Sequence, residues 1–483
     1  MGPERFDTVI IGTGFAGLGL AAQLRESGHD DFVLLEKADD IGGTWRENTY
    51  PGAECDVPSA LYSYSFEPNP TWDFKWAKQP QILQYINDFA DSRDLRRHLH
   101  TGVRVTAAEW LGDEWLVSTR DGDQFRCRYL VSAVGQLHHP RIPDFPGFAS
   151  YEGRAFHTAR WDHSAPLEDR DVACIGNAAS AIQLIPEVAE VARTLTVYHR
   201  SPNWIIDKGD RPYSRFEKWL GRVFPPLAKM YRASLWSQGE YGLWPAIQGK
   251  PLQGWFLRKQ HEKKLKTAFP DDPEMRAKLT PDYPIGARRI LLSDKYIEAL
   301  ARPNVEVVFD PIERFTADAI VAGGTERAHD VVAMATGFIT NPFLKEIDVT
   351  GEGGLSLCER WDDGAEAYLG VMTSGFPNLF MLYGPNTNTG HTSIIYKLEQ
   401  QFAMILKLMD RADDGVVRVK RDAEAAYNAE VQKRLRDTAW DKVEASWYKD
   451  GEKVTNNWPG SSREFKRRLT KPIFEHFDFE RVA

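Results

Sequence analysis

The chain has 483 residues, too many for one ordinary hydrophobic core, so two or three domains are expected. Its composition, 42% hydrophobic and 27% charged residues, is that of a globular protein. The formal net charge of −9 argues against nucleic acid as the main partner, because nucleic-acid-binding proteins usually carry a basic surface.

The cysteines and the apolar runs indicate the compartment. The four cysteines are scattered and include no C-x-x-C pair, which fits a reducing cytoplasm and offers neither a metal site nor a dithiol redox centre. No basic leader precedes the first strand pattern, and no apolar run approaches the length that spans a bilayer. A cytoplasmic protein without an integral membrane segment is therefore expected.

The first patterned stretch predicts a dinucleotide-binding unit. Phe6–Ile11 predicts a buried strand, a helix follows to about Ser27 with Gly28 as its cap, and Phe32–Leu35 predicts a second strand. A G-x-G-x-x-G turn joins the first strand to the helix, and Glu36 stands 24 residues after its first glycine. The glycines alone are a weak signal, but strand, helix and acid together favour a Rossmann unit over a structural turn.

Each residue type in this unit has a chemical reason. Gly12 permits the tight turn, Gly14 lets the backbone approach a pyrophosphate, and Gly17 lets the helix lie close to the strand. The helix N-terminus offers free N–H groups and partial positive charge to the phosphates. Glu36 can accept hydrogen bonds from both ribose hydroxyls and would repel a 2′-phosphate, so this site is expected to take FAD or NAD.

The same pattern recurs later in the chain. Asp171–Ile175 predicts a strand, a helix follows to about Val191, and Thr194–His199 predicts another strand. The turn begins at Gly176, and Arg200 stands 24 residues after that glycine. The fold class expected is therefore α/β, with two Rossmann-like dinucleotide-binding domains in one chain.

The residue at the end of the second strand changes the cofactor preference. Arg200 cannot accept a hydrogen bond from a 2′-hydroxyl but can grip a 2′-phosphate, so the second unit is interpreted as an NADPH site. Ala178 replaces the middle glycine, so the pyrophosphate is expected slightly further out. The alternative is that Arg200 is an ordinary surface residue at a strand end.

Two such sites imply hydride transfer from NADPH to bound FAD. Reductases and oxygenases both use this step. A disulfide reductase would need a redox cysteine pair near the flavin, and the sequence contains none, so the electrons are expected to go to oxygen.

Two further stretches resemble the fingerprints of the Baeyer–Villiger monooxygenases, the class B flavoprotein monooxygenases. The first is Gly42-Gly43-Thr44-Trp45, Tyr50-Pro51-Gly52 and Asp56, and the second is Tyr151, Gly153, His157, Trp161 and Asp162. Tyr151 replaces the family's phenylalanine, and Trp161 is a position where the related N- and S-oxidising flavin monooxygenases usually carry tyrosine. The resemblance covers nearly the whole chain. For Trp45 or Tyr50 alone, core packing is the simpler interpretation.

The resemblance implies a catalytic pair. Arg289 falls on the family's arginine that stabilises the oxygenated flavin, and Asp56 corresponds to the acid that positions it. Arg288 falls where the family places a lysine that helps hold the NADP phosphate. A fixed guanidinium can hold negative charge without giving up its proton. Without the resemblance, a basic surface pair would be the preferred interpretation. Glu54 departs from the family, which often has arginine there.

The expected cofactor contacts follow from these motifs, with a weaker one near the C-terminus, where Trp447 resembles a tryptophan that folds over NADP. No metal ligands are predicted. The residues expected to bind FAD and NADP are Gly12, Gly14, Phe15, Gly17, Glu36, Thr44, Trp45, Asp56 and Tyr62, followed by Gly176, Asn177, Ser180, Ala181, Arg200, Ser201, Arg288 and Trp447.

The domain boundaries follow the two units. Residues 1–150 and 333–483 are expected to form the FAD domain, and 151–211 and 284–332 the NADP domain. Residues 212–283 are rich in helix formers and resemble the family's helical insertion. Their four tryptophans are expected mostly to pack, with substrate access or a membrane-facing entry as the alternative.

The function expected is an NADPH- and O2-dependent monooxygenase that converts ketones or aldehydes to esters or lactones through a C4a-peroxyflavin. One alternative keeps the cofactors but oxygenates nitrogen or sulfur. A second is an NADPH-dependent flavoprotein reductase or redox-sensing protein without oxygen insertion. The sequence selects no particular ketone and no oligomeric state.

Overall fold

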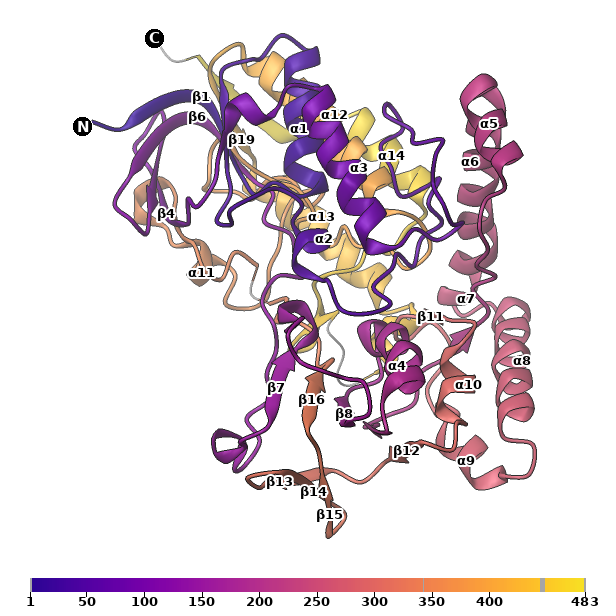
Figure 1. Cartoon of the computed structure of the whole chain (residues 1–483). Helices are drawn as coiled ribbons and strands as arrows, with labels where there is room; N and C mark the ends of the chain where they lie inside the picture. The colour runs from indigo at the N-terminus through magenta and orange to yellow at the C-terminus, as the bar shows by residue number, and fades with distance from the viewer. Residues whose placement is uncertain (1, 342, 444–447, 482–483) are drawn as a thin grey trace.

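A computed structural model describes residues 2–341, 343–443 and 448–481. The chain forms two mainly parallel sheets and a helical projection (Figure 1). The first sheet and its helices occupy the top of the view, the second sheet lies below them, and helices of the projection follow the right-hand edge. Among the described residues, no helix combines the length and apolar character that crossing a membrane requires.

In the first sheet β1 lies in the interior, with parallel neighbours β2 and β6. The second half of β6 also pairs with β18, and its first half pairs with β5, the nearer strand of the antiparallel hairpin β4–β5. In sheet order the strands are β17 (Asp348–Thr350), β4 (Val105–Trp110), β5 (Trp115–Thr119), β6 (Gln124–Ser132), β1 (Glu4–Ile11), β2 (Phe32–Leu35) and β3 (Leu99–His100), with β18 (Leu379–Met381) beside β6.

Helices and apolar side chains cover both faces of this sheet. Ile10 of β1 belongs to the cluster under the helices, whereas Val9 and Ile11 belong to the opposite cluster, as strand alternation requires. The helices and outer strands of this half are α1 (Phe15–Glu26), α2 (Thr44–Glu47), α3 (Gln79–Ser92), α11 (Leu357–Arg360), α12 (Ile394–Ala412), α13 (Arg421–Leu435), α14 (Ser462–Thr470), β19 (Val416–Val419), β20 (Lys449–Asp450), β21 (Lys453–Val454) and β22 (Phe477–Glu480).

The second sheet is parallel throughout, and its three inner strands are apolar and buried on both faces. Its order is β12 (Val305–Val308), β9 (Thr194–Tyr198), β8 (Asp171–Ile175), β16 (Val331–Met334) and β7 (Arg154–His157), with α4 (Ala179–Val191) and α10 (Tyr296–Leu300). A three-stranded meander is formed by β13 (Ile312–Phe315), β14 (Ala319–Ala322) and β15 (Thr325–Ala328).

The helical projection leaves the second half between two short parallel strands, β10 (Ile205–Ile206) and β11 (Leu291–Leu292). Of its tryptophans, Trp244 is buried and Trp236 is half-buried, but Trp219 and Trp255 are exposed, so the expectation that most of them pack is wrong for these two. The helices are α5 (Arg215–Val223), α6 (Pro225–Gln238), the π-helix η4 (Gly239–Leu243), α7 (Trp244–Ile247), α8 (Pro251–Ala268) and α9 (Pro273–Lys278).

The two connections between the halves run antiparallel beside each other. Arg141 N donates to Gly337 O at 2.9 Å, and Ile339 N donates to His139 O at 2.9 Å. Short 3-10 turns complete the fold: η1 (Arg96–His98), η2 (Phe148–Ser150), η3 (Thr158–Arg160), η5 (Glu352–Gly354), η6 (Ala439–Lys442) and η7 (Phe474–His476). The paired connections bring the carboxyl ends of the central strands of both sheets to one region of the molecule, where ligands bind in parallel sheets.

Candidate active site

The first glycine turn leaves no room for side chains. Gly12 has φ +101°, and a Cβ there would lie 2.7 Å from the Ala133 carbonyl oxygen. A Cβ on Gly17 would collide with the Gly12 carbonyl oxygen. Helix α1 starts after Gly14 without a side-chain cap and without an acid in its first turn. Its N-terminal N–H groups are therefore available to an anion such as a pyrophosphate.

Glu36 lies directly after β2, beside this turn. Its Oε2 accepts hydrogen bonds from Thr13 N at 3.0 Å and Thr13 Oγ1 at 2.6 Å, and its Oε1 accepts one from Ala38 N at 3.1 Å. These bonds fix the carboxylate at the edge of the cavity. A carboxylate accepts more than three hydrogen bonds, so it retains capacity for ribose hydroxyls.

Three aromatic side chains lie beside the first glycine turn. Trp45 Nε1 donates to Tyr62 Oη at 3.0 Å, and the rings of Phe15 and Tyr62 meet edge to face with centroids 5.2 Å apart. All three residues line the cavity, as does Thr44. The hydrogen bond and the ring contact fix the orientation of these side chains, so they form a rigid wall for a flat ring.

The second glycine turn repeats the geometry of the first. Gly176 has φ +118°, and a Cβ there would collide with the Ala335 carbonyl oxygen. Helix α4 follows Ala178, again without a side-chain cap and without an acid in its first turn. A second free helix N-terminus therefore faces the cavity, although alanine replaces the middle glycine.

The loop after β9 is tied to the turn. Burial lowers the pKa of His199 to about 4, so its neutral Nε2 accepts from Asn177 Nδ2 at 2.9 Å. The same Asn177 amide donates to the Ser201 carbonyl oxygen. Arg200 is exposed, lines the cavity and forms no ion pair with a residue of the described ranges. Ala181 is buried on the inner face of α4 and contributes packing instead.

Arg288 lies with this loop. Its Nη1 donates to Ser201 Oγ at 2.8 Å, and its guanidinium stands 4.6 Å from the centre of the Tyr283 ring. Arg200, Ser201 and Arg288 thus line one part of the cavity. Two guanidinium groups and a hydroxyl are suited to a phosphate group.

Arg289 pairs with Asp56 across a long sequence separation. Arg289 Nε lies 2.7 Å and Nη2 lies 2.6 Å from Asp56 Oδ2, and both side chains are about 30% exposed. The charge of Asp56 raises the pKa of Arg289 further above its usual value, so this guanidinium stays charged. Tyr448 also bonds to Arg289, and burial raises the pKa of its phenol to about 12.

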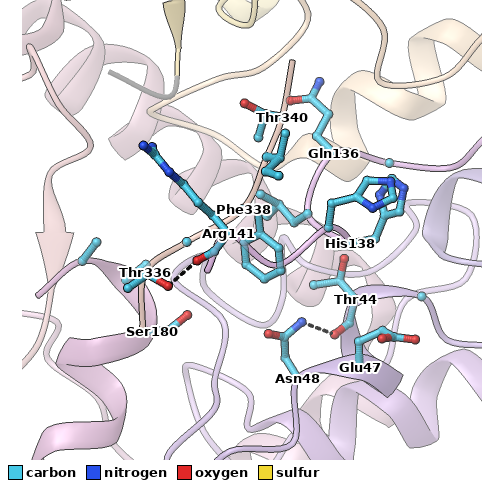
Figure 2. A pocket seen from close by; sticks show the side chains of 18 of the residues that line it. Thr44, Glu47, Asn48, Gln136, His138, Arg141, Ser180, Thr336, Phe338 and Thr340 are labelled. Carbon is cyan, nitrogen blue, oxygen red and sulfur yellow. Dashed lines mark hydrogen bonds between the residues drawn. The ribbon is translucent and has the colours of Figure 1, made fainter. Parts of the chain in front are cut away.

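One cavity of about 1080 Å³ joins both sites. It is lined by the predicted cofactor residues except Gly17 and Ala181, which lie behind the two helix starts, and Trp447, which lies outside the described residues. Figure 2 shows Thr44, Glu47 and Asn48 from the first half facing Arg141, Thr336 and Phe338 of the two connections, with Ser180 at the start of α4 nearby. Asp56 and Arg289 line the same cavity.

The turn before Asp56 docks on the second half, which the sequence did not indicate. Tyr50 Oη donates to Gln183 Oε1 at 2.8 Å, and Gln183 Nε2 donates to the Glu54 carbonyl oxygen at 2.9 Å. A Cβ on Gly52 would collide with the Gln183 carbonyl oxygen. Gln183 on α4 therefore contacts the backbone that carries Asp56, and no motif in the sequence singled it out.

Glu54, where the chain departs from the family pattern, is held by two lysine side chains. Its carboxylate forms ion pairs with Lys78 and with the buried Lys208. Lys208 also stands 5.2 Å from the centre of the Trp76 ring. An arginine at position 54 would lie against two lysines and be repelled by them. The glutamate at this position therefore suits the charge of its neighbours.

Comparisons with known proteins agree with this geometry. A family model described as pyridine nucleotide-disulphide oxidoreductase matches residues 9–220. All four cysteines are free, so this match reflects the nucleotide-binding fold and gives no dithiol centre. Among solved structures, cyclohexanone monooxygenase from Rhodococcus sp. Phi1 bound to NADP+ is 28% identical with a TM-score of 0.89, and the match covers 100% of both chains. A complex of OTEMO with FAD and NADP is 27% identical with a TM-score of 0.88, over 99% of this chain and 100% of that one.

Two bacterial relatives are more similar in sequence. A Baeyer–Villiger monooxygenase of Streptomyces coelicolor is 39% identical, and the match covers 99% of this chain and 94% of the relative. A Baeyer–Villiger monooxygenase of Pseudomonas aeruginosa is 40% identical, over 96% of this chain and 89% of the relative. With identity at this level over nearly the full length, the chain belongs to the Baeyer–Villiger monooxygenase family.

Proposed function

We propose that this enzyme uses FAD, NADPH and O2 to convert ketones or aldehydes to esters or lactones. The observation that carries the proposal is the ion pair of Arg289 with Asp56 in the cavity that joins the two nucleotide turns. A reductase needs the two nucleotide sites, but it has no need of a fixed cation between them.

The residues present fit both cofactors. Two glycine turns that exclude a Cβ lead into uncapped helix starts, which suits two pyrophosphates. Glu36 suits the unsubstituted ribose of FAD, and Arg200 with Arg288 suits the 2′-phosphate of NADPH. When bound, the cofactors supply a hydride and oxygen activation at the reduced flavin.

The side chains around the cavity have separable tasks in this proposal. Arg289 stabilises negative charge on the oxygen to be transferred, and its raised pKa keeps its protons in place. Asp56 holds the guanidinium through Nε and Nη2 and so fixes where that positive charge is presented. Trp45, Tyr62 and Phe15 give the flat ring a wall.

We also propose the domain division and the compartment. Residues 1–150 and 333–483 form the FAD domain, 151–211 and 284–332 the NADP domain, and 212–283 its helical insertion. Sheet membership supports these limits, although β16 of the second sheet extends to Met334, two residues past the limit at 332. Four free cysteines, three of them buried, support a reducing cytoplasm.

Product analysis under 18O2 tests the reaction. We would incubate the purified protein with NADPH and a panel of cyclic, aromatic and long-chain ketones and one sulfide. The masses of the products are then measured by mass spectrometry. Ketones should yield esters or lactones that carry one 18O atom. Oxygenation of the sulfide alone would replace the proposal with heteroatom oxidation. NADPH oxidation that yields only hydrogen peroxide with every substrate would contradict oxygen insertion.

A variant pair connects the product to the site. Arg289→Ala should lower ester formation by at least about a hundredfold, since a preorganised charge at a reacting oxygen commonly contributes that much. Arg302→Ala removes an exposed arginine that does not line the cavity and should leave the rate unchanged. Equal rates in both variants would remove Arg289 from the mechanism.

A further inference from the structure

Helix α5 turns an apolar face to solvent. Phe216, Trp219 and Val223 are 65%, 54% and 58% exposed, and their spacing places them on one side of the helix. None of the nine residues of α5 is buried. Ser214 and Glu217 form a full capping box at its start, so the start of the helix is stabilised by these local hydrogen bonds.

The face continues into α6. Phe224, Leu227 and Met230 are 57%, 40% and 68% exposed, and with the three side chains of α5 they form what we call the α5–α6 apolar face. Ten of the sixteen exposed large apolar side chains of the described ranges lie between residues 216 and 256. Such a concentration on one projection marks an interaction site, because single exposed apolar residues are scattered on ordinary surfaces.

The other side of the hairpin is anchored to the body of the protein. Lys218 pairs with Asp73, Arg232 donates to the Ala60 carbonyl oxygen, and the ring of Trp236 lies tilted against that of Tyr396 with centroids 6.0 Å apart. The hairpin is therefore held in place while its apolar face stays uncovered. Figure 1 shows α5 and α6 at the edge of the molecule. None of the six side chains of the α5–α6 apolar face lines the active-site cavity.

Basic residues accompany this face. The α5–α6 hairpin, residues 215–238, contains five Lys or Arg and one Glu, a formal charge of +4 in a chain whose total is −9. Arg215, Arg222 and Lys229 alternate with the apolar side chains, are exposed, and form no ion pair with an acid of the described ranges. Positive charge is thus concentrated where the apolar side chains are exposed.

We propose that the α5–α6 apolar face docks the enzyme on the surface of an anionic lipid bilayer. Phe, Trp, Leu and Met side chains next to Lys and Arg are the combination that interfacial helices use, with the apolar groups entering the headgroup region and the cations contacting anionic lipids. Docking of this kind needs no spanning helix and is independent of the reaction proposed above.

Charge argues against a second copy of this chain as the occupant. A closed dimer would place the same basic face of two subunits against each other, because a twofold interface is self-complementary. The +4 hairpin of one subunit would then meet the +4 hairpin of the other, and the resulting repulsion opposes the contact. A bilayer with anionic headgroups complements the same charge.

Vesicle sedimentation of the full-length protein tests the docking. We expect at least about tenfold more protein on vesicles of phosphatidylcholine with phosphatidylglycerol than on phosphatidylcholine alone, and a loss at high salt. The triple variant Phe216→Ser, Trp219→Ser, Met230→Ser and the triple variant Arg215→Glu, Arg222→Glu, Lys229→Glu should each bind at least about tenfold less.

Matched controls change the same residue types elsewhere. Leu111→Ser with Val191→Ser and Ile473→Ser removes exposed apolar groups, and Arg314→Glu with Arg421→Glu and Lys433→Glu reverses exposed charges. Both controls should sediment like the parent protein, and all variants should keep its melting temperature. Equal sedimentation of the parent with both vesicle types would overturn the proposal. So would a lipid-free dimer, detected by light scattering, that only the α5–α6 variants abolish.

Discussion

Arg289 reaches a single oxygen of Asp56 with two of its nitrogens, which leaves the third nitrogen directed elsewhere. This contact holds the guanidinium less firmly than a bidentate contact with both carboxylate oxygens would. Both side chains are also partly exposed to the cavity. The contact therefore has more value for orientation than for folding stability, because partly exposed ion pairs contribute little net free energy.

The variant Asp56→Asn separates orientation from charge at Arg289. The amide oxygen can still accept one hydrogen bond, but the charge-assisted part is lost, which is about 1–2 kcal/mol or roughly tenfold in rate. We expect ester formation to fall about tenfold or more, while NADPH oxidation falls less and hydrogen peroxide accumulates. Asp73→Asn, at an exposed pair with Lys218, is the control and should change neither rate. A parallel loss of both rates would contradict a positioning role for Asp56.

Arg200 supports a second prediction at the same scale. Because it is exposed and has no ion-pair partner in the described ranges, its charge is available to the 2′-phosphate. Arg200→Gln should lower kcat/KM for NADPH about tenfold or more and leave the value for NADH nearly unchanged. Arg170→Gln, an exposed arginine away from the cavity, should change neither value. If kcat/KM falls equally for both coenzymes, Arg200 does not recognise the 2′-phosphate.

Single residues were predictable where backbone geometry dictates the residue type. Gly12 and Gly176 occupy positions where any Cβ meets a carbonyl, so the sequence shows glycine at both. Gln183 follows no such rule, because a half-buried glutamine on a helix face has many structural uses. Its role depends on where the first half of the chain comes to lie, which no local pattern encodes.

The π-helix η4 attaches the insertion to the first half of the molecule. Glu240 is buried there, with Oε2 accepting from Ser462 N at 3.1 Å and lying 3.2 Å from His391 Nε2. The carboxylate thus sits at the start of α14, where the helix dipole favours negative charge. These contacts lower the pKa of Glu240 to about 2.

Removing that carboxylate should destabilise the protein in a pH-dependent way. Glu240→Ala leaves the Ser462 N–H and its neighbours without an acceptor, which costs about 1–3 kcal/mol. Since the folded-state pKa is lowered, the contribution is fully present above the usual 4.5 and is lost as the pH falls toward about 2. Melting temperatures should therefore differ most near neutral pH. Glu262→Ala, at a surface pair with Lys259, is the control and should shift the melting temperature little.

Elements were predictable to different degrees. The strands Phe32–Leu35 and Asp171–Ile175 match the sequence expectation residue for residue, because parallel strands buried on both faces form continuous apolar runs. The helical content of the insertion followed from composition, but which tryptophans pack did not. Trp219 belongs to a helix whose own period is amphipathic, and an amphipathic stripe predicts burial only if another surface covers it.

The whole molecule depends on how its two halves meet. The antiparallel connections set one boundary of the cavity, and the contact of Gln183 with the turn before Asp56 sets another. Each glycine motif predicted one nucleotide-binding unit by itself. The distance between the two halves follows instead from these long-range contacts. The cavity that joins the sites is therefore a property of the assembled chain.

Gln183→Leu tests that boundary. The variant keeps the size of the side chain but removes the acceptor of Tyr50 Oη and the donor to the Glu54 carbonyl oxygen, both partly buried, at a cost of about 1–3 kcal/mol. Because Asp56 follows that backbone by two residues, we expect a higher KM for NADPH and a larger share of NADPH consumed as hydrogen peroxide. Steady-state rates with paired product and peroxide assays measure both. Gln124→Leu, an exposed position on β6, should leave both unchanged. A lower melting temperature with normal coupling would limit Gln183 to a structural role, since the proposed shift of Asp56 is expected to change the share of hydrogen peroxide.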